Sequence, residues 1–167
     1  MTGKKMDIPM ADAGILASEL LKERPEVCYD VGVVPHLCDL KDPAVEKLLT
    51  SYDNAKFINV KDDPLQVVKE IAECRYIISS SLHGLIVADS LGIPNMYLVF
   101  GDRLLGDGDK FEEYYSAYGV EAQPRDLRTE KAPELTEIKE QYQILPEMVE
   151  EKKRQMKAAF PYPVKNR

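Results

Sequence analysis

Three consecutive serines and a histidine follow a short apolar segment near the middle of the chain. They lie in RYIISSSLHGLIVADSLGIPNMYL, residues 75–98. Ser80 and Ser81 come directly after a predicted strand, and His83 follows two residues later. Serine hydroxyls cap helices, and histidine exchanges protons near neutral pH. These residue types at a strand end could therefore bind an anion and move a proton, and we expect Ser80 and Ser81 to face an open cleft from which His83 is accessible.

A helix predicted over residues 81–91 would strengthen such a site. Its first turn presents backbone N–H groups and the positive end of the helix dipole, and both favour an anion. Gly84 would let a ligand approach the backbone closely, because glycine has no side chain. A plainer interpretation stays open, in which a serine only caps the helix and His83 only hydrogen-bonds a neighbouring loop.

Strands and helices alternate along residues 27–100. Strands are predicted at 27–36, 56–60, 76–79 and 94–100, and helices at 42–52, 62–74 and 81–91. Two of these helices begin with Asp-Pro, which combines a capping side chain with a residue that suits the first turn. This alternation predicts an α/β fold, with a Rossmann-like parallel sheet covered by helices on both faces.

The rest of the chain does not show this alternation of strands and helices. A glycine- and aspartate-rich loop at 101–110 precedes a short helix at 111–119, and 133–160 is predicted helical with a break near Pro146. The piece ADAGILASELLKE near the start also has a helical pattern. We expect one domain over 1–167, with a Rossmann-like core at about 27–120 and C-terminal helices at about 133–160 that pack back against the sheet.

Composition excludes several classes of function. The chain has 167 residues, 44% of them hydrophobic, and a net charge of −7, which argues against non-specific binding to nucleic acid. No apolar run is long enough to cross a bilayer, and the start lacks the pattern of a secretory signal, so we expect a cytoplasmic protein. Three cysteines without C-x-x-C spacing predict neither disulfides nor a metal site, and we expect small thiols that are buried or half-buried. No cofactor is expected.

His36 is a second candidate. It follows Pro35 at the end of the predicted strand 27–36, and a parallel sheet would place it on the same edge as His83. A histidine that only satisfies a loop carbonyl is an equally open interpretation.

Three motifs in order resemble the polysaccharide pyruvyl transferase family. SSSLHGLIVADSLGIPNMYL resembles the family signature, in which a strand leads to Ser-x-Leu-His or Ser-Arg-Leu-His, an apolar helix and Gly-(Ile/Val)-Pro. YDVGVVPHLCD (29–39) resembles the family strand that ends in Pro-His, and DKFEEYYSAYG (109–119) its Asp-Lys-Phe-x-x-Tyr-Tyr segment. The resemblance spans about residues 12–120.

The resemblance implies a two-domain, glycosyltransferase-B-like enzyme, of which this chain is similar to the C-terminal half only. The missing N-terminal half would act in cis or in trans. Members transfer the enolpyruvyl group of phosphoenolpyruvate to sugar hydroxyls as a ketal in exopolysaccharide biosynthesis, so the partners would be phosphoenolpyruvate and a sugar or lipid-linked saccharide acceptor. No nucleic acid is implied.

The resemblance also implies roles for residues. His83 would shuttle a proton, and the substrate-binding positions would be His36, Ser80, Ser81, Leu82, Gly84, Arg103 and Lys110. One departure is clear, because some members have arginine where this chain has Ser81. Such an arginine would hold an anion bidentately, and serine carries no charge. The positive charge would then come from Arg103, Lys110 or Arg75, or from the missing half.

Two other functions stay open. The chain could be a Rossmann-like binding or assembly module without catalysis, or half of a nucleotide-sugar glycosyltransferase, since one fold serves many functions.

Overall fold

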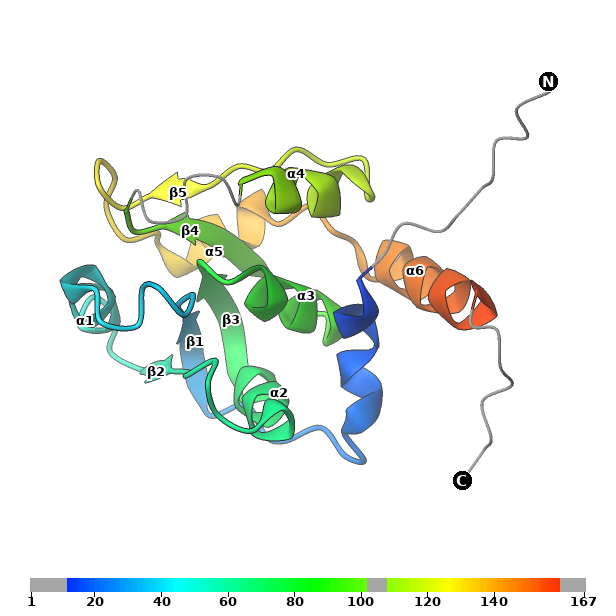
Figure 1. The fold of residues 1–167 in the computed structure, drawn as a ribbon. Coiled ribbons are helices and arrows are strands. Elements are labelled where there is room, and N and C mark those ends of the chain that lie inside the picture. The colour runs from blue at the N-terminus through cyan, green and yellow to red at the C-terminus, as the bar shows by residue number, and fades with distance from the viewer. Residues whose placement is uncertain (1–11, 102–107, 160–167) are drawn as a thin grey trace, which may run out of the picture.

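A five-stranded, fully parallel sheet forms the centre of the molecule. The computed structural model describes residues 12–101 and 108–159, and the sheet order is β2-β1-β3-β4-β5 (Figure 1). The strands are β1 (Tyr29–Val34), β2 (Ala55–Phe57), β3 (Cys74–Ser79), β4 (Asn95–Val99) and β5 (Arg125–Asp126). The predicted parallel α/β fold is confirmed. The fifth strand was not predicted, because two residues carry no periodicity.

Both Asp-Pro helix starts occur as expected. In α1 (Pro43–Leu49) the carboxylate of Asp42 accepts the N–H of Ala44 at 3.0 Å. In α2 (Pro64–Ala72) the carboxylate of Asp63 accepts the N–H of Leu65 at 3.0 Å. Each aspartate therefore satisfies a backbone donor that the helix itself leaves without an acceptor.

The remaining helices lie where they were predicted, and one of them is a 3-10 helix. They are α3 (Leu82–Ser90), α4 (Gly108–Ser116), α5 (Leu135–Gln141) and α6 (Pro146–Ala159). The predicted break near Pro146 is the gap between α5 and α6. The segment near the start forms a 3-10 helix, η1 (Ala13–Leu20), with Asp12 as its N-cap.

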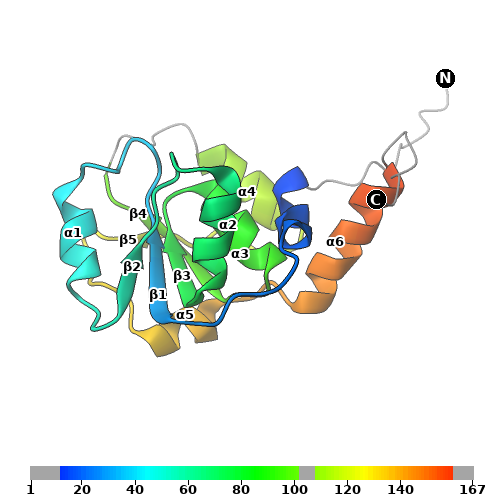
Figure 2. The same ribbon diagram turned by 90° about the horizontal axis from the view of Figure 1, so that it is seen from below.

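Side chains of the strands alternate between the two faces of the sheet. Val31 and Val33 of β1 pack with α1 and α5, while Val34 packs with η1, α2 and α3. The two views of the ribbon show α2 and α3 on the same side of the sheet (Figures 1 and 2). Because both faces are covered, the interior positions of the central strands are apolar and buried, as in Val31, Val33 and Val34 of β1 and Ile77 and Ile78 of β3.

The C-terminal helices pack differently from one another. Ile138 of α5 lies in the core against the sheet, as predicted. The expectation is wrong for α6, which packs beside η1 and α3 and not on the sheet. Lys153 of α6 explains this position, because its buried ammonium group donates to the carbonyl of Ser90 at 2.9 Å and to the hydroxyl of Ser18 at 3.0 Å. The ammonium group lies at the C-terminus of α3, where a cation is favoured.

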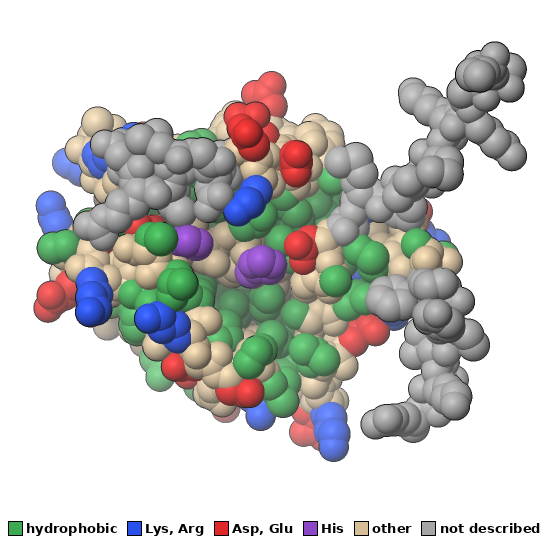
Figure 3. All heavy atoms as spheres, viewed as in Figure 1, with side chains coloured by type: hydrophobic (Ala, Val, Ile, Leu, Met, Phe, Trp, Pro, Cys, Tyr) green, Lys and Arg blue, Asp and Glu red, His purple; other side chains and the backbone are tan. Residues whose placement is uncertain are grey.

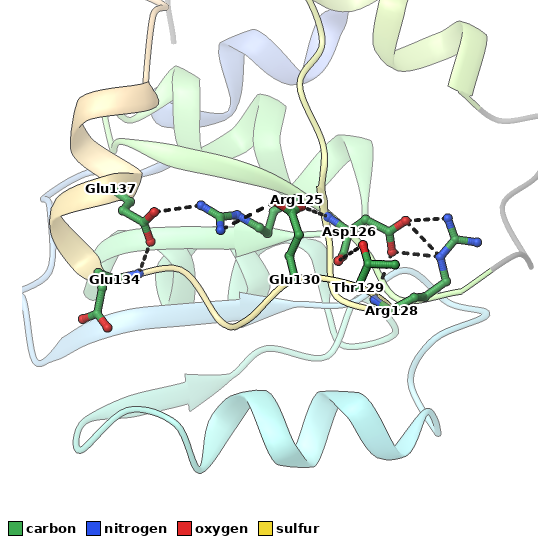
Figure 4. Close-up of polar contacts among 7 residues, drawn as sticks. All are labelled: Arg125, Asp126, Arg128, Thr129, Glu130, Glu134 and Glu137. Carbon is green, nitrogen blue, oxygen red and sulfur yellow. Dashed lines mark hydrogen bonds and ion pairs between the residues drawn. The ribbon is translucent and has the colours of Figure 1, made fainter.

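Ionic contacts fix the segment around β5 (Figure 4). The guanidinium of Arg125 donates to Glu137 of α5 at 3.0 Å, and Arg128 pairs with Asp126. Glu134 and Glu137 form a capping box at the start of α5, in which Glu137 accepts the N–H of Glu134 at 2.7 Å. That backbone bond and Arg125 lower the pKa of Glu137. The short strand therefore pairs with β4 through its backbone and is tied to α5 by the side chain of Arg125.

A fully buried carboxylate joins four elements on the α3 side of the sheet. Asp89 of α3 accepts hydrogen bonds from Tyr114 (2.6 Å), Tyr142 (2.8 Å) and the amide of Asn95 (2.6 Å). Burial raises its pKa from 3.8 to about 6, while the three hydrogen bonds oppose that shift. The three donors reduce the cost of burying the carboxylate.

Asp89 is expected to make stability depend on pH. Its pKa is higher in the folded than in the unfolded chain, so its stabilising contribution is complete below about pH 4 and is lost as pH rises through about 6. Urea unfolding of the native chain and of Asp89→Asn at about pH 4.5 and about pH 7 measures this. The native chain should lose about 2 kcal/mol more than the variant between these two pH values.

The exposed turn residue Asp53 gives the matched control. Asp53→Asn should follow the native chain at both pH values. If Asp89→Asn did the same, the buried carboxylate would not titrate in this range.

Candidate functional site

The ends of β1 and β3 bring two polar segments together. Val34 and Ser79 are paired in the parallel register, so residues 35–39 and 80–83 leave the sheet side by side at its carboxyl edge. The chain runs from β1 outward to β2 and then returns to β3 on the other side of β1. Ligands of open α/β sheets bind at such a reversal of strand order. Topology therefore marks the edge where the motif lies.

The first two serines of the triplet are part of the scaffold. Ser79 and Ser80 are 1% and 0% exposed. The hydroxyl of Ser79 lies 2.7 Å from the carbonyl of Val34 and accepts the N–H of Ser81 at 2.9 Å. The expectation that Ser80 faces an open cleft is wrong: its hydroxyl donates to Asp39 at 2.7 Å and accepts the N–H of His36 at 2.9 Å.

Ser81 occupies the N-cap position of α3. Its backbone is extended (φ −97°, ψ 122°), and its side chain makes no capping hydrogen bond. Ser81 is therefore at the predicted cap position, but its hydroxyl does not cap the helix. The first N–H groups of α3 have no acceptor within the helix, as at every helix start. Ser81 also lines a cleft, described below, beside these groups.

Gly84 is required for packing. A Cβ atom at this position would lie 2.6 Å from the hydroxyl oxygen of Ser79 and 2.8 Å from a methyl carbon of Val34. The missing side chain therefore lets α3 approach the ends of β1 and β3. Close approach brings the N-terminus of α3 to the carboxyl edge of the sheet.

The two histidines lie on one face of the molecule, next to apolar surface (purple and green in Figure 3). The side chain of His83 is 76% exposed, and its Nε2 lies 3.8 Å from a carboxylate oxygen of Asp12. His36 is half-buried, and its Nδ1 accepts the N–H of Cys38 at 3.2 Å. His83 is therefore open to solvent, as expected. The ring of His36 is instead held by its hydrogen bond from the backbone of Cys38.

A cleft of about 570 Å³ contains both histidines. It lies between η1, α2, α3 and the end of β1, and its wall is mainly apolar. Its lining residues are Ala17, Leu20, Val34, His36, Leu37, Val60, Lys61, Asp62, Pro64, Val67, Val68, Ser81, His83, Gly84 and Val87. The structure thus brings His36, Ser81, His83 and Gly84 together, out of the residues predicted from sequence.

Other predicted site residues lie elsewhere. Leu82 is partly buried and packs against the α4 side, away from the cleft lining. Lys110 is exposed in the first turn of α4 and is not part of that lining. Arg103 lies outside the described residues. Arg75 is near the amino end of β3, opposite the motif, so its expected contribution to an anion site there is wrong.

The described ranges contain no cluster of three or more side chains suited to a metal ion. In the same ranges, no helix is both long and apolar enough to span a bilayer. Cys74 is buried as expected, and burial raises the pKa of its thiol to about 12, whereas Cys28 and Cys38 are exposed. The expectation of buried or half-buried thiols is therefore wrong for two of the three cysteines.

A second hollow of about 420 Å³ lies between α1 and residues 127–134. Its lining residues are Ala44, Lys47, Leu48, Ser51, Tyr52, Leu127, Glu130, Lys131, Ala132, Pro133 and Glu134. It contains no histidine and is away from the ends of β1 and β3. We therefore take the cleft at the two histidines as the candidate site.

Sequence reasoning missed two carboxylates beside the histidines. Asp39 is 2% exposed and bonds Ser80, and Asp12 lies beside His83. Asp39 could have been noticed as an acidic residue just after the Pro-His motif, in a turn on the predicted edge. Nothing in the sequence links Asp12 to a residue seventy positions later.

Gly84→Ala is expected to destabilise the fold by about 1–3 kcal/mol, because the new methyl group would overlap Ser79 and Val34. Urea unfolding measures the change. Gly101→Ala is the control, since a Cβ there would meet no atom within 4 Å, and it should change stability by less than about 0.5 kcal/mol. Equal stability of the two variants would show that α3 does not need this close contact.

Comparison with known proteins identifies a family match over the first part of the chain. A family model described as "Polysaccharide pyruvyl transferase" matches residues 15–100, which include both histidines and the serine triplet. The chain is also 38% identical over 120 residues to an uncharacterized protein of Acanthamoeba polyphaga mimivirus, covering 68% of this chain and 41% of that protein.

No solved structure matches the chain. The chain spans about two fifths of the length of the curated relative from the mimivirus. The family match covers more than half of this chain, from η1 to the residue after β4. On this basis, the chain belongs to the polysaccharide pyruvyl transferase family.

Proposed function

We propose that this chain is one domain, the C-terminal half, of a transferase that moves the enolpyruvyl group of phosphoenolpyruvate onto a sugar as a ketal. The observation that carries the proposal is the cleft at the ends of β1 and β3, where His36, His83 and the start of α3 meet. This cleft lies within the region that matches the family.

The reaction needs proton transfer at two places. Two sugar hydroxyl oxygens bond to C2 of phosphoenolpyruvate, the methylene carbon gains a proton, and the bond from C2 to the phosphate oxygen breaks. Of the two protons that the hydroxyls lose, one balances the new methyl group and the other leaves with inorganic phosphate. His83 is the proposed proton carrier, because it is exposed in the cleft and imidazole exchanges protons near neutral pH.

Hydrogen-bond donors for the anionic groups come from the start of α3 and from its neighbours. The N–H groups of residues 82–84, the hydroxyl of Ser81 and the ring of His36 are the proposed contacts. Ser80 has no exposed surface to offer a ligand. Leu82 and Gly84 contribute through their backbone.

Positive charge is scarce in the described part of the cleft. Lys61 is the sole Lys or Arg among its described lining residues, and Asp62 is next to it. Phosphoenolpyruvate is a multiply charged anion, so further cations are needed. We propose that Arg103, Lys110 or the rest of the enzyme supplies them, in place of the arginine that some members carry at the position of Ser81.

The remaining half is expected to face this cleft, in cis or in trans. Leu20 and Leu37 on its rim are 58% and 52% exposed, and these two apolar side chains could contact that half. The acceptor would be a sugar or a lipid-linked saccharide for exopolysaccharide biosynthesis. We propose a cytoplasmic reaction, because phosphoenolpyruvate is produced there.

The scarcity of cations favours one alternative. A mainly apolar cleft with a single lysine also suits a non-catalytic binding or assembly module. Half of a nucleotide-sugar glycosyltransferase would need similar cations for its diphosphate. Turnover of phosphoenolpyruvate by the complete enzyme separates these functions from the proposed one.

His83→Ala in the complete enzyme is expected to lower ketal formation by about 10²–10⁴-fold, the usual contribution of a general acid or base. Release of inorganic phosphate from phosphoenolpyruvate with a sugar acceptor measures the rate. The complete enzyme is needed because this half alone should turn over little substrate.

Stability provides the check on folding. The side chain of His83 is largely exposed, so its truncation should change the unfolding free energy by less than about 0.5 kcal/mol. Glu147→Ala, at an exposed position of α6, is the control and should leave the rate unchanged. Full activity of His83→Ala would remove this residue from the mechanism.

A further inference from the structure

A buried hydrogen-bond chain under the cleft connects Asp39, Ser80 and His36. Ser80 donates to the Asp39 carboxylate at 2.7 Å and accepts the backbone N–H of His36 at 2.9 Å. The N–H of Asp39 donates to the carbonyl of His36 at 2.8 Å, which closes the turn 36–39. Both ends of this turn are thus attached to one hydroxyl group on the neighbouring strand end.

The ring of His36 is constrained by the same turn. Its Nδ1 accepts the N–H of Cys38 at 3.2 Å. A nitrogen that accepts a hydrogen bond carries its lone pair there, so the neutral ring holds its proton on Nε2. His36 therefore presents an N–H donor to the cleft that it lines.

We propose that Asp39 and Ser80 are positioning residues, which hold His36 as a fixed Nε2–H donor toward an oxygen of the anionic substrate. This inference rests on the proposed function for the identity of the ligand. It divides the work between the two histidines, because His83 has no such turn and its ring lies beside the carboxylate of Asp12 at 3.8 Å.

Asp39 and Ser80 of this hydrogen-bond chain are buried, so they can affect a ligand only by fixing the position of His36. Asp39 and Ser80 are 2% and 0% exposed, so neither reaches a ligand directly. Ser80 is suited to its place, because a hydroxyl donates one hydrogen bond and accepts others. Loss of the Ser80 hydroxyl would leave the Asp39 carboxylate and the backbone N–H of His36 without this partner in the interior.

The first experiment determines which ring nitrogen of each histidine carries the proton, by long-range ¹H–¹⁵N NMR of this chain at about pH 8.5, where neutral imidazole is observed. The native chain should show His36 with its proton on Nε2. Ser80→Ala and Asp39→Ala should show a mixture of the two tautomers. Asp39→Asn retains an oxygen that accepts from Ser80, and it should behave as the native chain does.

His83 is the internal reference, and its ring signals should be the same in all variants. A native His36 with its proton on Nδ1, or an unchanged Nε2–H form in Ser80→Ala, would overturn the positioning role. The native measurement tests the proposal even if a variant does not fold.

The second experiment titrates the same proteins with phosphoenolpyruvate and follows the ring signals. Affinity should fall by about tenfold in Ser80→Ala and stay unchanged in Asp39→Asn, as expected for one hydrogen bond to a charged group. An altered tautomer without any loss of affinity would leave the positioning role standing and would count against the proposed function. The two proposals can therefore fail separately.

Discussion

The arrangement of the site depends on one constraint, the parallel pairing of Val34 with Ser79 at the ends of β1 and β3. In a parallel sheet this register sets the two following segments side by side at one edge. The hydroxyl of Ser79 bonds the carbonyl of Val34, and that of Ser80 bonds the N–H of His36, so side chains continue the pairing where the strands stop. Both histidines are placed by this pairing.

The same constraint separates scaffold from chemistry within the motif. Ser79, Ser80 and Gly84 face inward, where hydroxyls bind two loops and the missing side chain admits α3. Ser81, which is 6% exposed, and the largely exposed His83 line the cleft at the helix start. A row of polar residues at a strand end is thus mostly structural, and the residues available to a ligand are those that follow the turn into α3. The reversal of strand order between β1 and β3 is what leaves a cleft there.

Local patterns made most of the fold predictable, since Asp-Pro starts and apolar periodicity mark helices and strands without knowledge of contacts. The prediction that His83 is accessible needed only its position in a first turn. The inward direction of Ser80 could not be predicted, because it is set by Asp39, forty-one residues away. The packing of α6 on η1 likewise depends on a long-range contact of Lys153 with Ser18. Strand β5 has only the two residues Arg125 and Asp126, and an ion pair of Arg125 ties it to α5, so the sequence carries no hydrophobic pattern for it.

A crystal structure of the chain soaked with phosphoenolpyruvate tests the central claim most directly. The account predicts the phosphate or the carboxylate at the start of α3, within hydrogen-bond distance of His36 Nε2, with the Ser80 hydroxyl still on Asp39. Phosphoenolpyruvate in the hollow between α1 and residues 127–134, or a Ser80 hydroxyl turned from Asp39 onto the ligand, would contradict it.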